Sequence, residues 1–188
     1  MIEAIIFDCF GVLAIDGWQV FKQQYFSHDQ ELARIVSNWW QQVESGSLKQ
    51  EECVRRIAAL VHVDESEVRA AIGHYGPDDE LLAYIRTVLK PDYRVGLLSN
   101  ASEKALARLF SPKQQALFDA VVLSQNAGVT KPSREAYHLI ADSLHTLPER
   151  CVFVDDQERH CRGAETAGMQ AIRYRDFTSF KTELQRRL

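Results

Sequence analysis

The chain has 188 residues, 46% of them hydrophobic, which is enough to bury one sizeable core together with a small appended domain. Its formal net charge is −4 and it has no run of basic residues, so neither nucleic acid nor an anionic membrane surface is expected as a partner. No apolar run approaches the roughly 18 residues that span a bilayer, and the first residues do not resemble a signal peptide. We therefore expect a cytoplasmic protein.

The cysteines are expected to be free thiols. They lie far apart in the sequence and form no C-x-x-C pair, which is typical of a protein from a reducing compartment. They are Cys9, Cys53, Cys151 and Cys161.

Short apolar strands alternate with amphipathic helices at both ends of the chain. The strands are expected at residues 4–7, 95–98, 120–123, 152–154 and 170–172. Helical apolar spacing separates the later strands from one another. Continuous apolar strands between amphipathic helices are typical of a parallel sheet that is covered on both faces. We therefore predict an α/β fold with a Rossmann-like sheet.

Between the first strand and the later ones, the apolar spacing is helical and no strand is expected. From Leu32 to Val43 the apolar residues follow the i, i+3, i+4, i+7 rule, and Ser47 followed by Gln50 predicts a capping box at the start of another helix. This pattern indicates an α-helical domain inserted into the α/β core. The predicted domains are a core of residues 1–14 and 78–188 and an insertion of residues 15–77.

Polar side chains follow four successive strands of the predicted sheet, at the point where each strand ends or in the loop after it. Because the carboxyl ends of parallel strands meet at one edge of the sheet, we expect these side chains to converge in one crevice. In chain order they are Asp8, Ser99, Asn100, Lys131, Asp155 and Asp156.

The chemistry of this set indicates phosphoryl transfer. Clustered carboxylates repel one another unless a cation binds, and hard oxygen ligands suit Mg²⁺. The Ser99 hydroxyl, the backbone N–H groups of Asn100 and Ala101 at a helix start, and the Lys131 ammonium can together hold an anion. Asp8, directly after a buried strand, can act as a carboxylate nucleophile.

The chain resembles the haloacid dehalogenase-like (HAD) hydrolase superfamily. Four stretches carry the resemblance in the family's order, at residues 5–13, 97–100, 128–132 and 152–169. They are distributed from the first strand to residue 169, so the resemblance covers essentially the whole chain and implies a Rossmann-like catalytic core. The helical insertion lies where the family carries a small α-helical cap domain.

The resemblance implies a nucleophile and a metal site. Asp8 would attack the substrate and form an aspartyl intermediate. Mg²⁺ would be bound by Asp8, by the backbone carbonyl of Phe10 and by Asp156, with Asp155 supporting the site.

The resemblance also implies an anion site. Ser99 and Lys131 would be catalytic and, with Asn100, would hold the phosphoryl oxygens of a small phosphorylated substrate. Lys131 would in addition offset the charge of the nucleophile.

Two positions depart from the family pattern. Phosphatases of this superfamily carry a second Asp where this chain has Phe10, and that general acid and base contributes about 10²- to 10⁴-fold. We therefore predict a slow phosphatase, or one that recruits its acid elsewhere, with Asp16 as the candidate surrogate. Family members also often place an Asp or Asn after Asp156 to hold water at the metal, and here Glu158 or His160 would have to replace it.

The true dehalogenases of the superfamily keep a second function open. They carry an aromatic residue followed by glycine, as in Phe10-Gly11, but they use no metal and have small polar residues where this chain has Asp155 and Asp156. Adjacent carboxylates without a cation are costly, which favours an Mg²⁺-dependent phosphatase of a small metabolite. The alternatives are a metal-independent 2-haloacid dehalogenase and a catalytically impaired member that binds a ligand or partner. The sequence is compatible with a monomer or a homodimer.

Overall fold

The computed structural model describes every residue except 45, 73–74 and 124–127. The chain divides into two compact units, one made of Met1–Ala14 and Pro77–Leu188 and the other of Ile15–Gly76. Among the described residues, no helix is long and apolar enough to cross a membrane.

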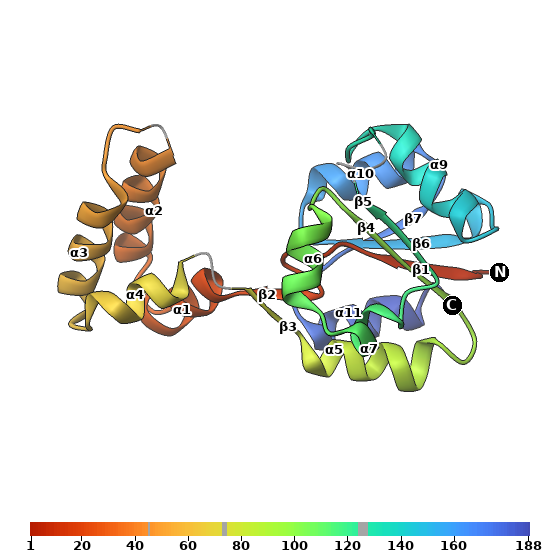
Figure 1. The fold of residues 1–188 in the computed structure, drawn as a ribbon, viewed down its shortest axis with the longest axis horizontal. Coiled ribbons are helices and arrows are strands. Elements are labelled where there is room, and N and C mark those ends of the chain that lie inside the picture. Colours follow the sequence, from red (N-terminus) through yellow and green to blue (C-terminus); the bar gives the residue numbers. More distant parts are fainter. Residues whose placement is uncertain (45, 73–74, 124–127) are drawn as a thin grey trace. The chain divides into compact units, whose positions relative to one another are not determined.

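The first unit is built on a five-stranded parallel sheet with the order β5-β4-β1-β6-β7 (Figure 1). All five predicted strands are present. Their bounds are β1 (Ala4–Phe7), β4 (Arg94–Ser99), β5 (Ala120–Leu123), β6 (Cys151–Asp155) and β7 (Gln170–Arg173). β1 is the central strand, so the residue that follows it lies in the middle of the carboxyl edge of the sheet.

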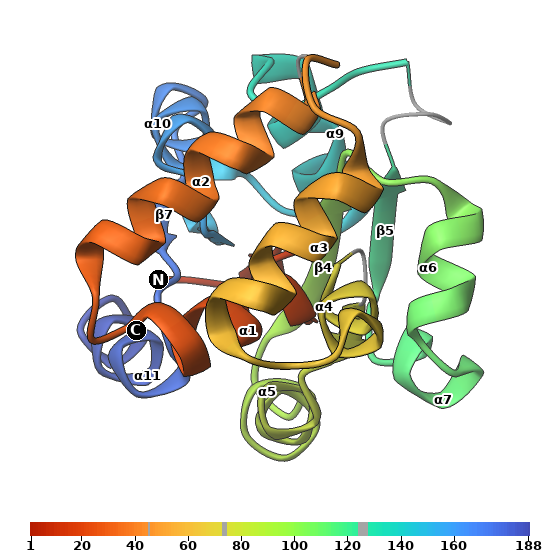
Figure 2. The same cartoon turned by 90° about the vertical axis from the view of Figure 1, so that its left-hand side faces the viewer.

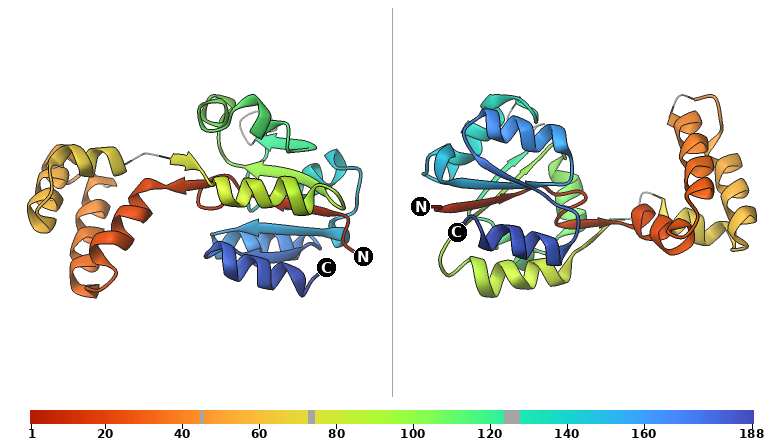
Figure 3. Two further views of the ribbon diagram at one scale, coloured as in Figure 1. Left: turned by 90° about the horizontal axis from the view of Figure 1, so that it is seen from below. Right: turned by 180° about the vertical axis from the view of Figure 1, so that it is seen from behind.

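Helices cover both faces of this sheet, as the α/β prediction requires. α9 and α10 lie over one face, and α5 and α11 lie over the other (Figures 1 and 3). The helical bounds are α5 (Asp79–Tyr84), continued by a π-helical turn at Ile85–Leu89, α6 (Glu103–Leu109), α7 (Pro112–Gln115), α9 (Arg134–Ser143), a 3₁₀ turn at Pro148–Arg150, α10 (Glu158–Thr166) and α11 (Phe177–Gln185).

Local signals explain where these helices begin and end. The Ser102 hydroxyl accepts a hydrogen bond from the Ala105 N–H at the start of α6. Gly168, with φ +98°, follows the end of α10, where a left-handed residue satisfies the last helical carbonyls. Helix α7, which was not predicted from the sequence, begins with a capping box between Ser111 and Gln114.

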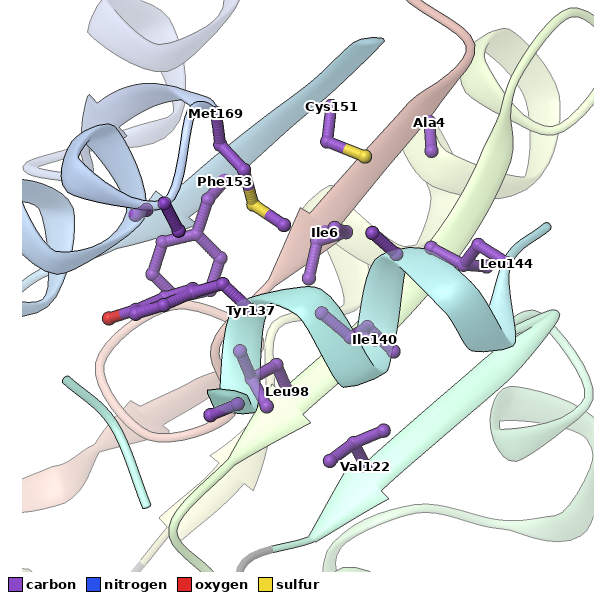
Figure 4. Packing of buried hydrophobic residues seen from close by; sticks show 14 residues of the cluster. Ala4, Ile6, Leu98, Val122, Tyr137, Ile140, Leu144, Cys151, Phe153 and Met169 are labelled. Carbon is purple, nitrogen blue, oxygen red and sulfur yellow. The ribbon is translucent and has the colours of Figure 1, made fainter. Parts of the chain in front are cut away.

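One hydrophobic core cluster of the first unit lies between the sheet and helices α9 and α10 (Figure 4). Ile6 and Phe153 from the strands pack with Tyr137 and Ile140 from α9, and all four side chains are fully buried. The rings of Tyr137 and Phe153 meet edge to face at 5.3 Å. Burying a side chain of this size contributes about 1.5–3 kcal/mol, so the packing fixes the strand ends that carry the polar residues.

The described residues of the second unit form four helices, which Figure 2 labels, and two short strands. A buried cluster that includes Trp18, Phe21, Val36 and Ile57 holds the helices together. Trp18 stacks on Phe21 with ring centroids 5.4 Å apart. The bounds are β2 (Ala14–Asp16), α1 (Gly17–Phe26), α2 (Gln30–Glu44), α3 (Gln50–Val61), α4 (Glu65–Ala71) and β3 (Tyr75–Pro77).

Two predictions for the insertion are wrong. β2 and β3 pair as a two-stranded sheet where the chain enters and leaves the second unit, although no strand was expected there. Ser47 does not cap α3, because its hydroxyl donates to the Gln42 carbonyl at 3.1 Å, and Lys49 takes the N-cap position without a side-chain hydrogen bond.

Candidate active site

The strand register brings the first and fourth predicted positions side by side. β1 and β6 pair in parallel with Phe7 opposite Val154, so the next residues, Asp8 and Asp155, are neighbours at the carboxyl edge. The Asp8 N–H donates to the Val154 carbonyl at 2.8 Å, which extends the strand pairing to Asp8 itself. Ser99 ends β4, on the other side of β1, and is buried.

Lys131 joins two of the carboxylates. Its Nζ lies 2.6 Å from Asp8 Oδ1 and 2.7 Å from Asp155 Oδ2, and all three side chains are almost completely buried. Burial raises the pKa of Asp8, and the Lys131 ammonium counters that rise. The lysine therefore supplies the positive charge that allows two buried carboxylates to lie next to each other.

Asn100 fixes the main chain of Lys131. The Lys131 N–H donates to Asn100 Oδ1 at 2.9 Å, and Asn100 Nδ2 donates to the Lys131 carbonyl at 3.2 Å. The neighbouring Ala101 N–H, expected to be available for an anion, donates to Ser99 Oγ at 3.3 Å. The Asn100 side chain thus organises the site through the lysine, a contact that the sequence did not predict.

His160 also belongs to the site, through a contact that differs from the one expected. Its ring is 3% exposed, and Nδ1 lies 3.0 and 3.1 Å from the two carboxylate oxygens of Asp155. The Tyr137 hydroxyl donates to the His160 carbonyl at 2.8 Å. Burial lowers the pKa of His160, the Asp155 carboxylate opposing that shift. The imidazole therefore turns toward Asp155.

Glu158, the other candidate to hold water at a metal, lies at the surface. Its carboxylate pairs with Arg162 and, at 3.5 Å, with Arg173. The side chain is about half exposed, at 53%. These contacts occupy the Glu158 carboxylate, and its part in holding water at a metal stays a prediction.

Asp156 has the features of a cation ligand. Its Oδ1 is buried and has no hydrogen-bond partner among the described residues. Burial, together with the charges of Asp155 and Asp8, raises the pKa of Asp156 to about 6. One oxygen from each of the three carboxylates lies within 4.8 Å of the others.

The donor set fits a divalent cation. The Asp155 oxygens already accept hydrogen bonds from Lys131 Nζ and from the Gln157 N–H, which leaves Asp8 and Asp156 to bind an ion. A cation would satisfy the unpartnered Asp156 oxygen and offset the repulsion between the carboxylates. Gly11, with φ +84°, makes room beside them, because a Cβ there would lie 2.8 Å from the Asp156 carboxylate.

Comparison with known proteins agrees with this geometry. The family described as haloacid dehalogenase-like hydrolase matches residues 2–168. The chain belongs to the haloacid dehalogenase-like hydrolase family. It is therefore a hydrolase, and its relatives include phosphatases of the same length.

Two such relatives are similar to the chain over nearly its full length. A sesquiterpene phosphatase of Aspergillus oryzae is 24% identical, with 97% of this chain and 95% of the relative covered. A D-ribitol-5-phosphate phosphatase of Bacteroides thetaiotaomicron is 26% identical, with 98% and 97% covered. These similarities support a phosphatase-like hydrolase.

Solved structures share the fold. A HAD-like hydrolase of Porphyromonas gingivalis superimposes with a TM-score of 0.60 at 25% identity, covering 99% of this chain and 98% of that one. A HAD-family enzyme of Bacteroides thetaiotaomicron, in complex with magnesium and inorganic phosphate, has a TM-score of 0.59 at 21% identity, covering 96% and 99%. The HAD fold therefore extends over both units of the chain.

The two remaining sequence candidates concern the acid and base of this HAD-family chain. Phe10 is half-buried in the turn after β1, where its backbone forms a bridge with Ala14. It offers no titratable group. The backbone of Asp16 ends β2, but its side chain lies outside the described residues, so its role as a surrogate acid stays a prediction.

Replacing Asp156 with asparagine should stabilise the protein when metal is removed. Its pKa rises from 3.8 to about 6 on folding, so the folded state holds more protons in this range and stability falls as pH increases through it. The shift corresponds to up to ~3 kcal/mol above pH 6, a cost that an uncharged amide avoids. Urea unfolding in EDTA at pH 4 and pH 7.5 measures the difference.

The gain in stability of Asp156→Asn should be seen at pH 7.5 and not at pH 4. Mg²⁺ should stabilise the wild type but not Asp156→Asn. Equal stability of the two proteins at pH 7.5 would show that the Asp156 carboxylate does not destabilise the folded protein. Asp142→Asn, an exposed change at the end of α9, serves as the control for loss of one negative charge.

Proposed function

We propose that the chain is an Mg²⁺-dependent phosphatase that hydrolyses a small phosphorylated metabolite through an aspartyl-phosphate on Asp8. The observation that carries the proposal is the buried Lys131 bridge between Asp8 and Asp155, beside a carboxylate of Asp156 that lacks a partner. This arrangement places a positive charge against the nucleophile, which favours its ionised form, next to a site for a cation.

In the first step an oxygen of Asp8 attacks phosphorus, and the bond from phosphorus to the leaving-group oxygen breaks. The electron pair leaves with that oxygen. Lys131 keeps Asp8 ionised, and with Ser99 it holds the oxygens of the transferring phosphoryl group. In the second step water attacks the phosphorus of the aspartyl-phosphate, the Asp8 carboxylate is regenerated, and both protons of the water leave on dihydrogen phosphate.

Asp8 and Asp156, with the Phe10 carbonyl that the family resemblance adds, would hold the Mg²⁺ ion. When bound, the ion neutralises charge on the nucleophile and on the phosphoryl group. The organisation of Lys131 by Asn100 and Asp155 does not depend on it.

The substrate is proposed at the level of a class. The full-length relatives are named for a sesquiterpene and for D-ribitol 5-phosphate, so they share a phosphatase reaction and differ in the organic group. We assign substrate selection to the inserted unit, Ile15–Gly76, as the cap domain. The shared chemistry is a phosphate ester small enough to enter a capped site.

Because position 10 carries no acid, the rate should depend steeply on the leaving group. An aryl oxygen leaves without a proton, whereas an alkoxide needs one. Phe10→Asp should accelerate hydrolysis of butyl phosphate by up to about 10²-fold while changing p-nitrophenyl phosphate little. Measuring kcat/KM on both substrates for both proteins provides the test.

Equal rates of the wild type on the two substrates would contradict this account of Phe10 and would indicate an acid from another position. In that case Asp16→Asn should lower kcat/KM for butyl phosphate more than for p-nitrophenyl phosphate.

The proposed function is tested by phosphate release from p-nitrophenyl phosphate with Mg²⁺ and with EDTA. Release that requires the metal supports it. Absence of release in both conditions would overturn it, and chloride release from 2-chloropropionate without metal would then identify a dehalogenase.

A further inference from the structure

A chain of contacts leads from α10 to the nucleophile. His160 Nδ1 lies within 3.1 Å of both Asp155 oxygens, Asp155 Oδ2 lies 2.7 Å from Lys131 Nζ, and Lys131 Nζ lies 2.6 Å from Asp8 Oδ1. Each of these side chains is buried. These contacts connect the nucleophile to His160 through Asp155 and Lys131.

The contacts define which nitrogen of His160 carries a proton. A carboxylate only accepts hydrogen bonds, so Nδ1, between the two Asp155 oxygens, must be the donor. The other ring nitrogen, Nε2, is buried and has no partner among the described residues. The tautomer with hydrogen on Nδ1 leaves only a lone pair unpartnered there, rather than a buried N–H.

The position of the imidazole is itself fixed by packing. The Tyr137 hydroxyl on α9 donates to the His160 carbonyl on α10. Gly163 permits this close approach, because a Cβ there would lie 2.8 Å from the same hydroxyl. The histidine is thus held in place before any substrate binds.

We propose that His160 is a positioning residue, whose Nδ1–H holds the Asp155 carboxylate in the orientation that keeps Lys131 Nζ against Asp8. By sharing the charge of Asp155, His160 also leaves more of the lysine's charge for Asp8 and for the phosphoryl oxygens. The proposal rests on the proposed phosphatase activity for its kinetic effect, while the contact itself can be tested without substrate.

The kinetic test uses three variants of one residue. In asparagine the amide nitrogen is bonded to Cγ, as Nδ1 is in histidine, whereas in glutamine it lies one bond further and matches Nε2. His160→Asn should therefore keep most of the wild-type kcat on p-nitrophenyl phosphate. His160→Ala and His160→Gln should lose about 10- to 100-fold in kcat with KM little changed.

Cys151→Ala provides the control for a general loss of packing. Cys151 is fully buried at the amino end of the same strand, β6, away from the carboxylates. It should lower the thermal stability with kcat unchanged. If His160→Ala likewise changed only stability, or if Gln rescued as well as Asn, the positioning role would be overturned.

A spectroscopic measurement separates this inference from the proposed function. In protein labelled with ¹⁵N-histidine, His160 should show a slowly exchanging proton on Nδ1, and Asp155→Asn should shift it strongly. A proton on Nε2 instead would overturn the inference even if the phosphatase activity is present. If the wild type lacks phosphatase activity but the Nδ1 proton is observed, only the proposed function fails.

Discussion

Asp8→Asn is expected to reduce Mg²⁺-dependent phosphate release from p-nitrophenyl phosphate by a factor of at least about 10⁴. The amide has the size of the carboxylate but cannot form the acyl-phosphate bond. The substitution also removes the negative charge that lies 2.6 Å from Lys131 Nζ. Because the substitution leaves the other side chains of the site in place, substrate affinity should change far less than turnover. Single-turnover kinetics at saturating substrate measures the loss directly.

Thermal unfolding of the same variant shows whether the loss has a structural origin. Lys131 keeps the Asp155 carboxylate as a partner, so the variant should fold. A folded Asp8→Asn protein that retains turnover within tenfold of the wild type would rule out Asp8 as the nucleophile.

Lys131→Met should have the largest effect on stability. Methionine replaces the aliphatic stem, but Asp8 and Asp155 are left buried side by side without their counter-charge. Breaking a buried ion pair in this way costs about 3–5 kcal/mol. Urea unfolding in EDTA measures the cost, and turnover should be lost as well.

The loss of stability in Lys131→Met should depend on pH. Without the lysine, the pKa of Asp8, which burial already raises, rises further above its value in the unfolded chain, so the folded state binds more protons. The destabilisation should therefore be small near pH 4 and should increase toward pH 8.

Lys90→Met is the matched control for Lys131→Met. Lys90 pairs with Asp119 at the protein surface, where the Lys90 side chain is 27% exposed. Such a pair contributes less than about 1 kcal/mol. If the two lysine variants lower the free energy of unfolding by the same amount, Lys131 does not stabilise a buried charge network.

The sequence was sufficient to predict the sheet and the residues at its carboxyl edge. The strands β1, β4, β5 and β6 are built on short continuous apolar segments, and a polar residue or a polar loop follows each of them. Parallel pairing then brings Asp8, Lys131 and Asp155 together, as the structure shows. The two-stranded pairing of β2 and β3 could not be predicted, because strands of three residues have no detectable periodicity.

Which contacts each site residue makes could not be predicted from the sequence alone. Asp155 and Asp156 are adjacent in sequence, and only the register of β6 against β1 determines which carboxylate meets the lysine. Likewise, the His160 ring could have faced solvent, the metal site or Asp155 from its place in the first turn of α10. Its contact is set by the packing of α10 against α9.

Trapping the covalent intermediate tests the central claim most directly. Because Phe10 offers no base to activate water, the second step should be slow with an aryl substrate and phosphate should accumulate on the enzyme. Acid quenching of turnover, followed by borohydride reduction and peptide mass spectrometry, should show Asp8 converted to homoserine only when Mg²⁺ and substrate are both present. Steady release of phosphate by an enzyme whose Asp8 stays unmodified would contradict the aspartyl-phosphate mechanism.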